Sequence, residues 1–69
     1  MPENRKAAER RAKELGFPKS NVICLEGDNK CYIAPMGIKS YKAKKAYAEL
    51  RAQGKSQEDA AKIAHSIDE

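Results

Sequence analysis

The chain has 69 residues, of which 41% are hydrophobic and 35% charged, with a net charge of +4. That length suffices for one domain and excludes two, and the hydrophobic content exceeds that of a disordered charged tail. No run approaches the roughly 20 apolar residues of a membrane span, and the charged residues 1–6 exclude a secretory signal. We therefore expect a single folded domain over residues 1–69, located in the cytoplasm and without membrane contact.

The first expected element is a helix over residues 3–15. Ala8, Ala12 and Leu15 recur at helical spacing and form a thin apolar stripe. Gly16 follows directly, and a glycine at that position supplies the left-handed residue that commonly ends a helix. Because the stripe consists mostly of alanine, this helix is expected to pack lightly.

Residues 21–35 predict a β-hairpin, since two runs rich in β-favouring residues flank a turn cluster. Two registers fit the sequence. With a two-residue type II′ loop that begins at Gly27, Cys24 lies directly opposite Cys31. With the loop shifted by one residue, Cys24 faces Ile33. In both registers the two sulfur atoms lie on the same face of the hairpin.

Both faces of this hairpin are apolar. In the first register one face carries Ile23, Leu25, Tyr32 and Ala34, and the other carries Val22, Cys24, Cys31 and Ile33. A two-stranded hairpin alone is only marginally stable, so its apolar faces must be covered. Helices on both sides would cover them. Alternatively, one face is used for association with a protein partner or a second copy of the chain.

Two further helices are expected, over residues 41–53 and 57–67. Ser40 and Ser56 are suitable N-caps, and Gly54 ends the first of the pair. The expected fold class is therefore α+β. It is a single small domain of order α-β-β-α-α, in which three helices pack on a two-stranded antiparallel hairpin.

The large apolar side chains are expected to form the core of this domain. They are Leu15, Phe17, Ile23, Leu25, Tyr32, Ile33, Ile38, Tyr47, Leu50, Ile63 and Ile67. Each falls on a predicted apolar stripe, in a predicted strand or at an element boundary.

Positive charge is concentrated in residues 39–55, which carry six Lys or Arg against Glu49 alone. Basic residues interleaved with an aromatic suit phosphate contacts and base stacking. An anion bound there would also offset the unfavourable effect of lysines near a helix N-terminus. The candidate residues for binding nucleic acid or another polyanion are Lys39, Tyr41, Lys42, Lys44, Lys45, Arg10 and Arg11. The alternative interpretation is a solvated helix surface.

The two C-terminal helices carry, between residues 47 and 64, the pattern Tyr-x-x-Leu-Arg-x-x-Gly-x-Ser-x-x-x-Ala-Ala-x-Ile-Ala. This pattern resembles the helical hairpin that ends some small uncharacterised bacterial and phage proteins. Those proteins have no established activity, so the resemblance implies no activity for this chain. It also resembles the first two helices of helix-turn-helix domains. That resemblance implies a recognition helix next, for which residues 66–69 are too short. We therefore expect the pair to serve as a packing unit.

Cys24, Cys31 and His65 are the only soft metal ligands in the sequence, whereas a structural zinc site needs four. In the cytoplasm both thiols are expected to stay reduced and to act as small apolar core residues. The sequence contains neither a glycine-rich phosphate loop nor a nucleophile paired with a base. We therefore expect no enzyme activity, no bound metal and no cofactor.

The sequence favours a non-enzymatic interaction module that binds a protein partner or associates with itself through one apolar hairpin face. The alternative is a small nucleic-acid-binding protein that uses the basic residues 39–55. A second alternative is a redox or metal site at Cys24 and Cys31.

Overall fold

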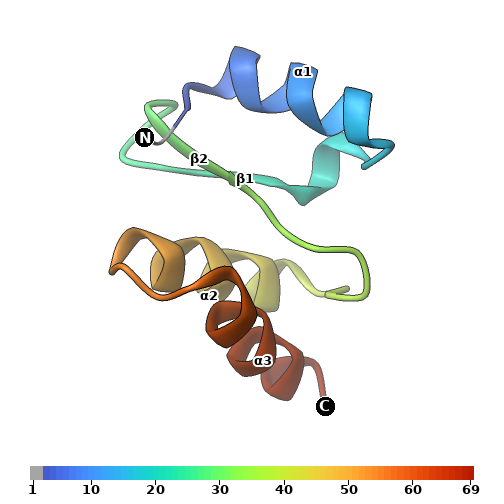
Figure 1. Cartoon of the computed structure of the whole chain (residues 1–69), viewed down its shortest axis with the longest axis vertical. Helices are drawn as coiled ribbons and strands as arrows, with labels where there is room; N and C mark the ends of the chain where they lie inside the picture. Colours follow the sequence, from blue (N-terminus) through green and yellow to red (C-terminus); the bar gives the residue numbers. More distant parts are fainter. Residues whose placement is uncertain (1–2) are drawn as a thin grey trace.

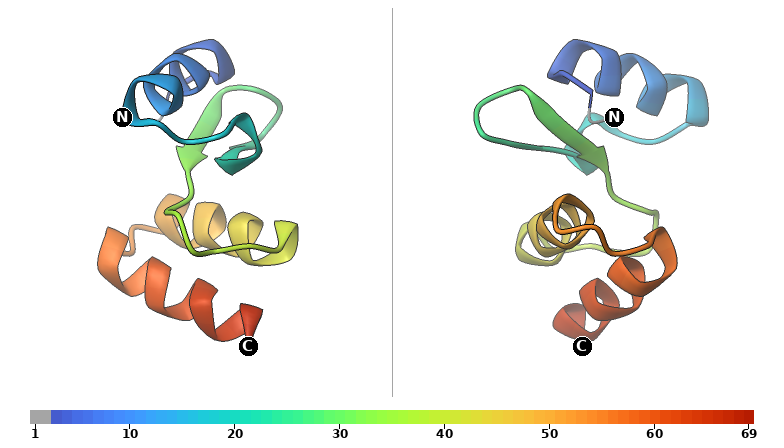
Figure 2. Two further views of the ribbon diagram at one scale, coloured as in Figure 1. Left: turned by 90° about the vertical axis from the view of Figure 1, so that its right-hand side faces the viewer. Right: turned by 60° about the vertical axis from the view of Figure 1, so that its left-hand side comes forward.

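The computed structural model describes residues 3–69 and confirms the α+β fold with the order α-β-β-α-α. The elements are α1 (Arg5–Leu15), a short 3-10 helix η1 (Lys19–Asn21), β1 (Val22–Leu25), β2 (Lys30–Ile33), α2 (Tyr41–Ala52) and α3 (Gln57–Asp68). Figure 1 shows four layers, in which α1 covers one face of the hairpin, α2 covers the other, and α3 packs on the outer side of α2. The two rotated views in Figure 2 show the same stacking.

Helix α1 begins at Arg5, so the predicted start at residue 3 is wrong. Glu3 instead has extended backbone, and its carbonyl accepts a 2.9 Å hydrogen bond from the N–H of Cys31 in an antiparallel bridge. The helix is then capped by Asn4, whose side-chain oxygen accepts a 2.9 Å hydrogen bond from the N–H of Ala7. Sheet pairing at Glu3 therefore sets the start of the helix.

The hairpin adopts the register in which Cys24 lies opposite Cys31. The predicted two-residue type II′ loop is wrong, because the last strand pair joins Leu25 to Lys30 and leaves residues 26–29 as the loop. Asp28 of this wider loop binds Arg5 at the start of α1. Its carbonyl accepts a 3.0 Å hydrogen bond from the main-chain N–H of Arg5, and its carboxylate lies 2.9 Å from the Arg5 guanidinium.

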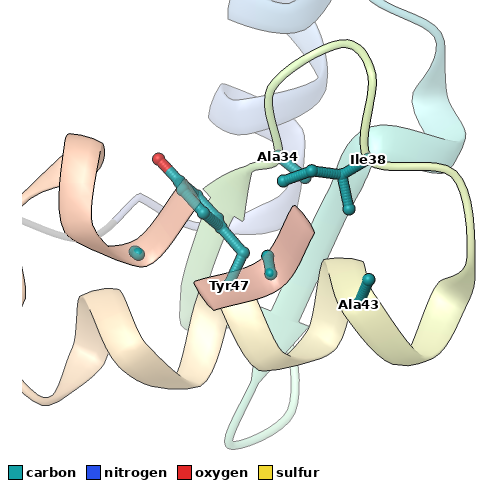
Figure 3. Packing of buried hydrophobic residues seen from close by; sticks show 6 residues of the cluster. Ala34, Ile38, Ala43 and Tyr47 are labelled. Atoms are coloured by element: carbon teal, nitrogen blue, oxygen red, sulfur yellow. The ribbon is translucent and has the colours of Figure 1, made fainter. Parts of the chain in front are cut away.

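Helices cover both faces of the hairpin, as one of the two alternatives predicted. The face toward α1 forms a cluster of Ala8, Ala12, Phe17, Val22, Cys24, Cys31 and Ile33. The opposite face joins α2 and α3 in a second cluster of Tyr32, Ala34, Ile38, Ala43, Tyr47, Leu50, Ala60, Ala61 and Ala64, part of which Figure 3 shows. Because both faces are covered within one chain, neither is left as a flat apolar docking surface.

The core consists mainly of alanine. The side chains with no exposed surface are Ala34, Ala43, Ala48, Ala60 and Ala64. Among the large residues expected in the core, Ile23, Ile38 and Tyr47 are buried, and Phe17, Leu25, Tyr32, Ile33 and Leu50 are half-buried. Alanine at the contact lines lets neighbouring helices approach closely, so larger side chains lie at the margins of each contact.

Three residues predicted to be in the core are exposed, so for them the prediction is wrong. Leu15 is 59% exposed, Ile63 43% and Ile67 39%. Leu15 lies in the last turn of α1, where the helix extends past the end of the hairpin. Ile63 and Ile67 lie on α3, the outermost helix, whose fully buried positions Ala60 and Ala64 face α2. Their helical periodicity is correct, but α3 is covered on one side only.

The alanine contact between α2 and α3 makes a direct prediction about stability. Replacing Ala64 with leucine should lower the free energy of unfolding by about 1–3 kcal/mol, because there is no space for the added methyl groups. Replacing Ala52, an exposed alanine at the end of α2, with leucine is the matched control and should change stability little. Urea unfolding followed by circular dichroism measures both. Equal effects of the two substitutions would contradict the close contact.

Candidate binding groove

The predicted basic cluster does not form one surface. Lys39, Tyr41, Lys42 and Lys45 are exposed at the start of α2, and Tyr41 is 67% exposed. Lys44, by contrast, is only 9% exposed, because it points toward the covered side of α2. The prediction that Lys44 belongs to an exposed basic surface is therefore wrong.

Arg10 and Arg11 lie in a different layer of the molecule from these lysines. Both lie on α1, whereas Lys42 and Lys45 lie on α2 at the other side of the hairpin (Figure 1), and Lys39 lies just before α2. Arg11 also forms an ion pair with Glu3. The hairpin therefore lies between the two helices that carry these groups, and we define the lysine face as Lys39, Tyr41, Lys42 and Lys45 only.

The anion expected at the N-terminus of α2 is supplied by the protein itself. The Asp68 carboxylate, at the end of α3, accepts hydrogen bonds from the main-chain N–H of Lys39 at 2.6 Å and from that of Ser40 at 3.2 Å. It also accepts one from the Ser40 hydroxyl at 2.6 Å. These bonds, led by the one from the Ser40 side chain, hold the pKa of Asp68 below its ordinary value. The helix terminus therefore does not require an external anion.

The two cysteines are paired in a disulfide, so the expectation of two reduced thiols is wrong for this structure. Cys24 and Cys31 lie directly opposite each other, with their Cα atoms 4.0 Å apart. The N–H of Cys31 points away from β1 toward Glu3, so this is a non-hydrogen-bonded strand pair, where opposed side chains come closest. The disulfide lies within the cluster under α1 and links the two strands.

No site for a metal ion is present among residues 3–69. No group of three or more His, Cys, Asp or Glu side chains is close enough to hold one. His65 is exposed on α3, beside Gly37. Within the same residues, no helix has the length and apolar character needed to cross a membrane.

A groove of about 500 Å³ opens beside β2, between α1 and α2. Arg11 and Leu15 of α1 form one wall, Ile33 of β2 lies at its floor, and Tyr47 and Arg51 of α2 form the other wall. This volume falls within the range of small ligand sites in proteins. The groove exists because the hairpin has only two strands, whereas the helices above and below it extend past its edge.

The two arginines in the groove differ in charge balance. Arg11 is paired with Glu3, but Arg51 forms no ion pair with any residue of the described range 3–69. One nitrogen of the Arg51 guanidinium donates a 2.7 Å hydrogen bond to the carbonyl of Lys55, which fixes the side chain at the end of α2. Burial raises the pKa of the neighbouring Tyr47, and the charge of Arg51 partly opposes that shift. In the part of the chain that the structure describes, the positive charge on the α2 wall therefore has no acidic partner.

The floor of the groove presents main-chain groups of β2. The N–H of Ala34 points toward β1 and donates to the carbonyl of Asn21. The N–H of Cys31 points to the outer edge of β2 and donates to the carbonyl of Glu3. Along a strand, the main-chain groups of successive residues point alternately to the two edges. Ile33 is two residues after Cys31, so its N–H and carbonyl also point away from β1. No residue within 3–69 forms a hydrogen bond with them. Among residues 3–69, the edge of β2 is thus paired at Cys31 and has no main-chain partner at Ile33.

No protein-family model matches this chain, and neither the curated proteins nor the solved structures include one detectably similar to it. The function must therefore be inferred from the residues themselves. Sequence reasoning singled out the lysines but did not identify the groove, whose lining residues come from separate elements without a shared motif. Leu15 and Arg51 become informative only once α1 and α2 are placed on opposite sides of β2, where both side chains line the groove.

The disulfide between Cys24 and Cys31 should stabilise the fold. Reducing it should lower the free energy of unfolding by about 2–3 kcal/mol, since the bond closes a short loop between positions seven residues apart. Urea unfolding with and without a reductant measures the change. The control is the double substitution of Cys24 and Cys31 by alanine, whose free energy of unfolding should be the same with and without the reductant. Mass spectrometry after thiol alkylation of the native protein should detect no modified cysteine. Two modified thiols would contradict the pairing.

The Asp68 carboxylate makes a prediction about acid stability. Its pKa is lowered on folding, so its stabilising effect is complete above its ordinary value of 3.8 and is lost as the pH falls through the lower folded value. The variant Asp68→Asn should be less stable than the wild type at neutral pH, and the difference should shrink below about pH 4.

Thermal unfolding between pH 2 and pH 7 measures this difference. Glu69→Gln is the matched control, because Glu69 is the adjacent carboxylate and its side chain forms no hydrogen bond with α2. A destabilisation by Asp68→Asn that is the same at every pH would contradict the assigned role of the charge.

Proposed function

We propose that this protein is a non-enzymatic interaction module that binds a segment of a partner protein in the groove beside β2. The observation that carries the proposal is an exposed apolar wall that faces Arg51 across the edge of β2, where neither Arg51 has an acidic partner nor Ile33 a main-chain partner among residues 3–69. It replaces the outer hairpin face, on which the sequence-based hypothesis rested and which α1 covers.

Leu15 supports a binding role for the groove. At 59% exposed it is among the most exposed large apolar residues of the described chain, and it lines the groove opposite α2. Removing such a side chain from water on binding a partner would be favourable, at roughly 25 cal/mol per Å² of apolar surface. Leu15 contributes little to packing inside the domain, because most of its side chain is exposed. Burial against a partner would account for a large apolar side chain at this position.

Selection of random peptides displayed on phage tests this proposal. Enriched peptides are then titrated against the protein by fluorescence anisotropy. The variant Leu15→Gln should weaken their binding about tenfold, equivalent to about 1.4 kcal/mol, because the apolar wall is lost. Circular dichroism should show an unchanged fold, since the side chain is mostly exposed.

Ile63→Gln is the matched control for Leu15→Gln. Ile63 is also a large exposed aliphatic residue, but it lies on α3 outside the groove. The proposal requires that this variant bind the peptides like the wild type. Loss of binding with Ile63→Gln and not with Leu15→Gln would move the interface to α3, and failure to enrich any peptide would contradict the proposed function.

A second candidate function is binding of nucleic acid by the lysine face. The observation that favours it is that Tyr41 is 67% exposed amid Lys39, Lys42 and Lys45, none of which forms an ion pair within residues 3–69. An exposed aromatic ring between basic side chains suits stacking with a base and contacts with phosphate.

A salt titration tests the lysine face. If single-stranded DNA or RNA binds there, Lys42→Gln combined with Lys45→Gln should weaken binding and reduce the slope of log K against log salt by roughly 0.7 per lost contact. Arg10→Gln, on α1 at the other side of the hairpin, is the control that should leave the slope unchanged. No binding at low salt would exclude this candidate.

A further inference from the structure

We infer that the groove beside β2 binds its partner as an added β-strand, and that the partner segment carries an acidic side chain that pairs with Arg51. This inference rests on the proposed function and specifies its ligand: an extended, acidic and partly apolar peptide segment from another protein.

The strand edge already accepts antiparallel pairing at one position. The N–H of Cys31 donates to the carbonyl of Glu3 across the outer side of β2, and the pair forms an antiparallel bridge. Ile33 lies two residues further along the same edge, so its N–H and carbonyl point in the same direction as those of Cys31. An extended backbone in the groove could therefore form two further main-chain hydrogen bonds. Addition of a strand to an exposed edge is an established mode of peptide recognition.

The positive charge of Arg51 in the groove favours an acidic side chain on the bound partner segment. Arg51 lines the groove, is held in place through the Lys55 carbonyl, and has no acidic partner within residues 3–69. The guanidinium has further N–H donors available, which suit a carboxylate. Because Arg11 on the facing wall is already paired with Glu3, one acidic side chain on the α2 side balances the charge of the groove.

The walls of the groove explain why the segment should also be apolar. Side chains of an added strand point alternately to its two faces. At the groove, one face of such a strand would point toward Leu15 on α1, and the other toward Tyr47 and Arg51 on α2. An apolar residue therefore suits the α1 side, and the acidic residue suits the α2 side.

Three blocked peptides of alternating threonine and valine test the inference. One carries a central glutamate, and the matched controls carry glutamine or lysine at the same position. The glutamate peptide should bind about tenfold more tightly than the glutamine peptide, and the lysine peptide should bind more weakly still. In the variant Arg51→Gln, which keeps an N–H donor near the Lys55 carbonyl, the glutamate and glutamine peptides should bind equally.

Amide chemical shifts locate the bound peptide and report the strand pairing. In a titration of the ¹⁵N-labelled protein with the glutamate peptide, the amide of Ile33 should move downfield and become protected from exchange, while residues of the lysine face should not shift. Methylating the backbone nitrogens of the peptide should weaken binding strongly, since a methylated nitrogen cannot donate to the Ile33 carbonyl.

The outcomes separate this inference from the proposed function. If phage-selected peptides bind and depend on Leu15, but show no preference for an acidic residue and leave the Ile33 amide unprotected, the inference is overturned and the interaction module stands. Shifts confined to the lysine face would overturn it as well. Binding of a small carboxylic acid as tight as that of the peptide would show a small-molecule site instead. Binding that requires removal of residues 1 and 2 would assign the groove to the chain's own N-terminus.

Discussion

A narrow sheet with two apolar faces determines the architecture of this protein. Two antiparallel strands bury too little surface to be stable alone, and here both faces of the pair carry apolar residues. The hairpin therefore needs cover on both sides, which α1 provides on one side and α2 on the other (Figure 2). Helix α3 then completes the cover of α2.

The open groove is a consequence of the same constraint. Helices are wider than a pair of strands, so helices on both sides of the hairpin leave a space beside the strand edge. On the β2 side Glu3 fills the start of that space by pairing with Cys31. The remainder forms the groove between Leu15 and Arg51. The proposed binding site is therefore the position of a third strand that residues 3–69 leave unfilled beyond Glu3.

Local features of the fold could be predicted from the sequence because their causes are local. Helical periodicity, Ser40 and Ser56 as N-caps and Gly16 as a stop gave the order of the elements and most of their boundaries. The choice of buried side chains could not be predicted in the same way. It depends on how closely the helices approach, so alanines such as Ala60 became the core while Ile63 on the same helix remained exposed.

The candidate site was harder to predict, because its determinants are far apart in the sequence. Asp68 caps a helix that begins 27 residues earlier, and this contact removes the reason for an external anion at that position. The burial of Lys44 follows from how α2 packs, since Lys44 is buried together with Ala43, Tyr47 and Ala48 of the same helix. The groove combines residues of α1, β2 and α2 that share no spacing or motif. Only the packing of the layers brings these residues together.

Amide hydrogen exchange along β2 tests the central claim most directly, since it reports which main-chain groups of the strand are paired. The amides of Tyr32 and Ala34 face β1, and that of Cys31 faces Glu3, so all three should exchange slowly. The amide of Ile33 lies between them in sequence but faces the groove, and it should exchange much faster. Uniform protection of all four amides would contradict the open edge and with it the proposed site.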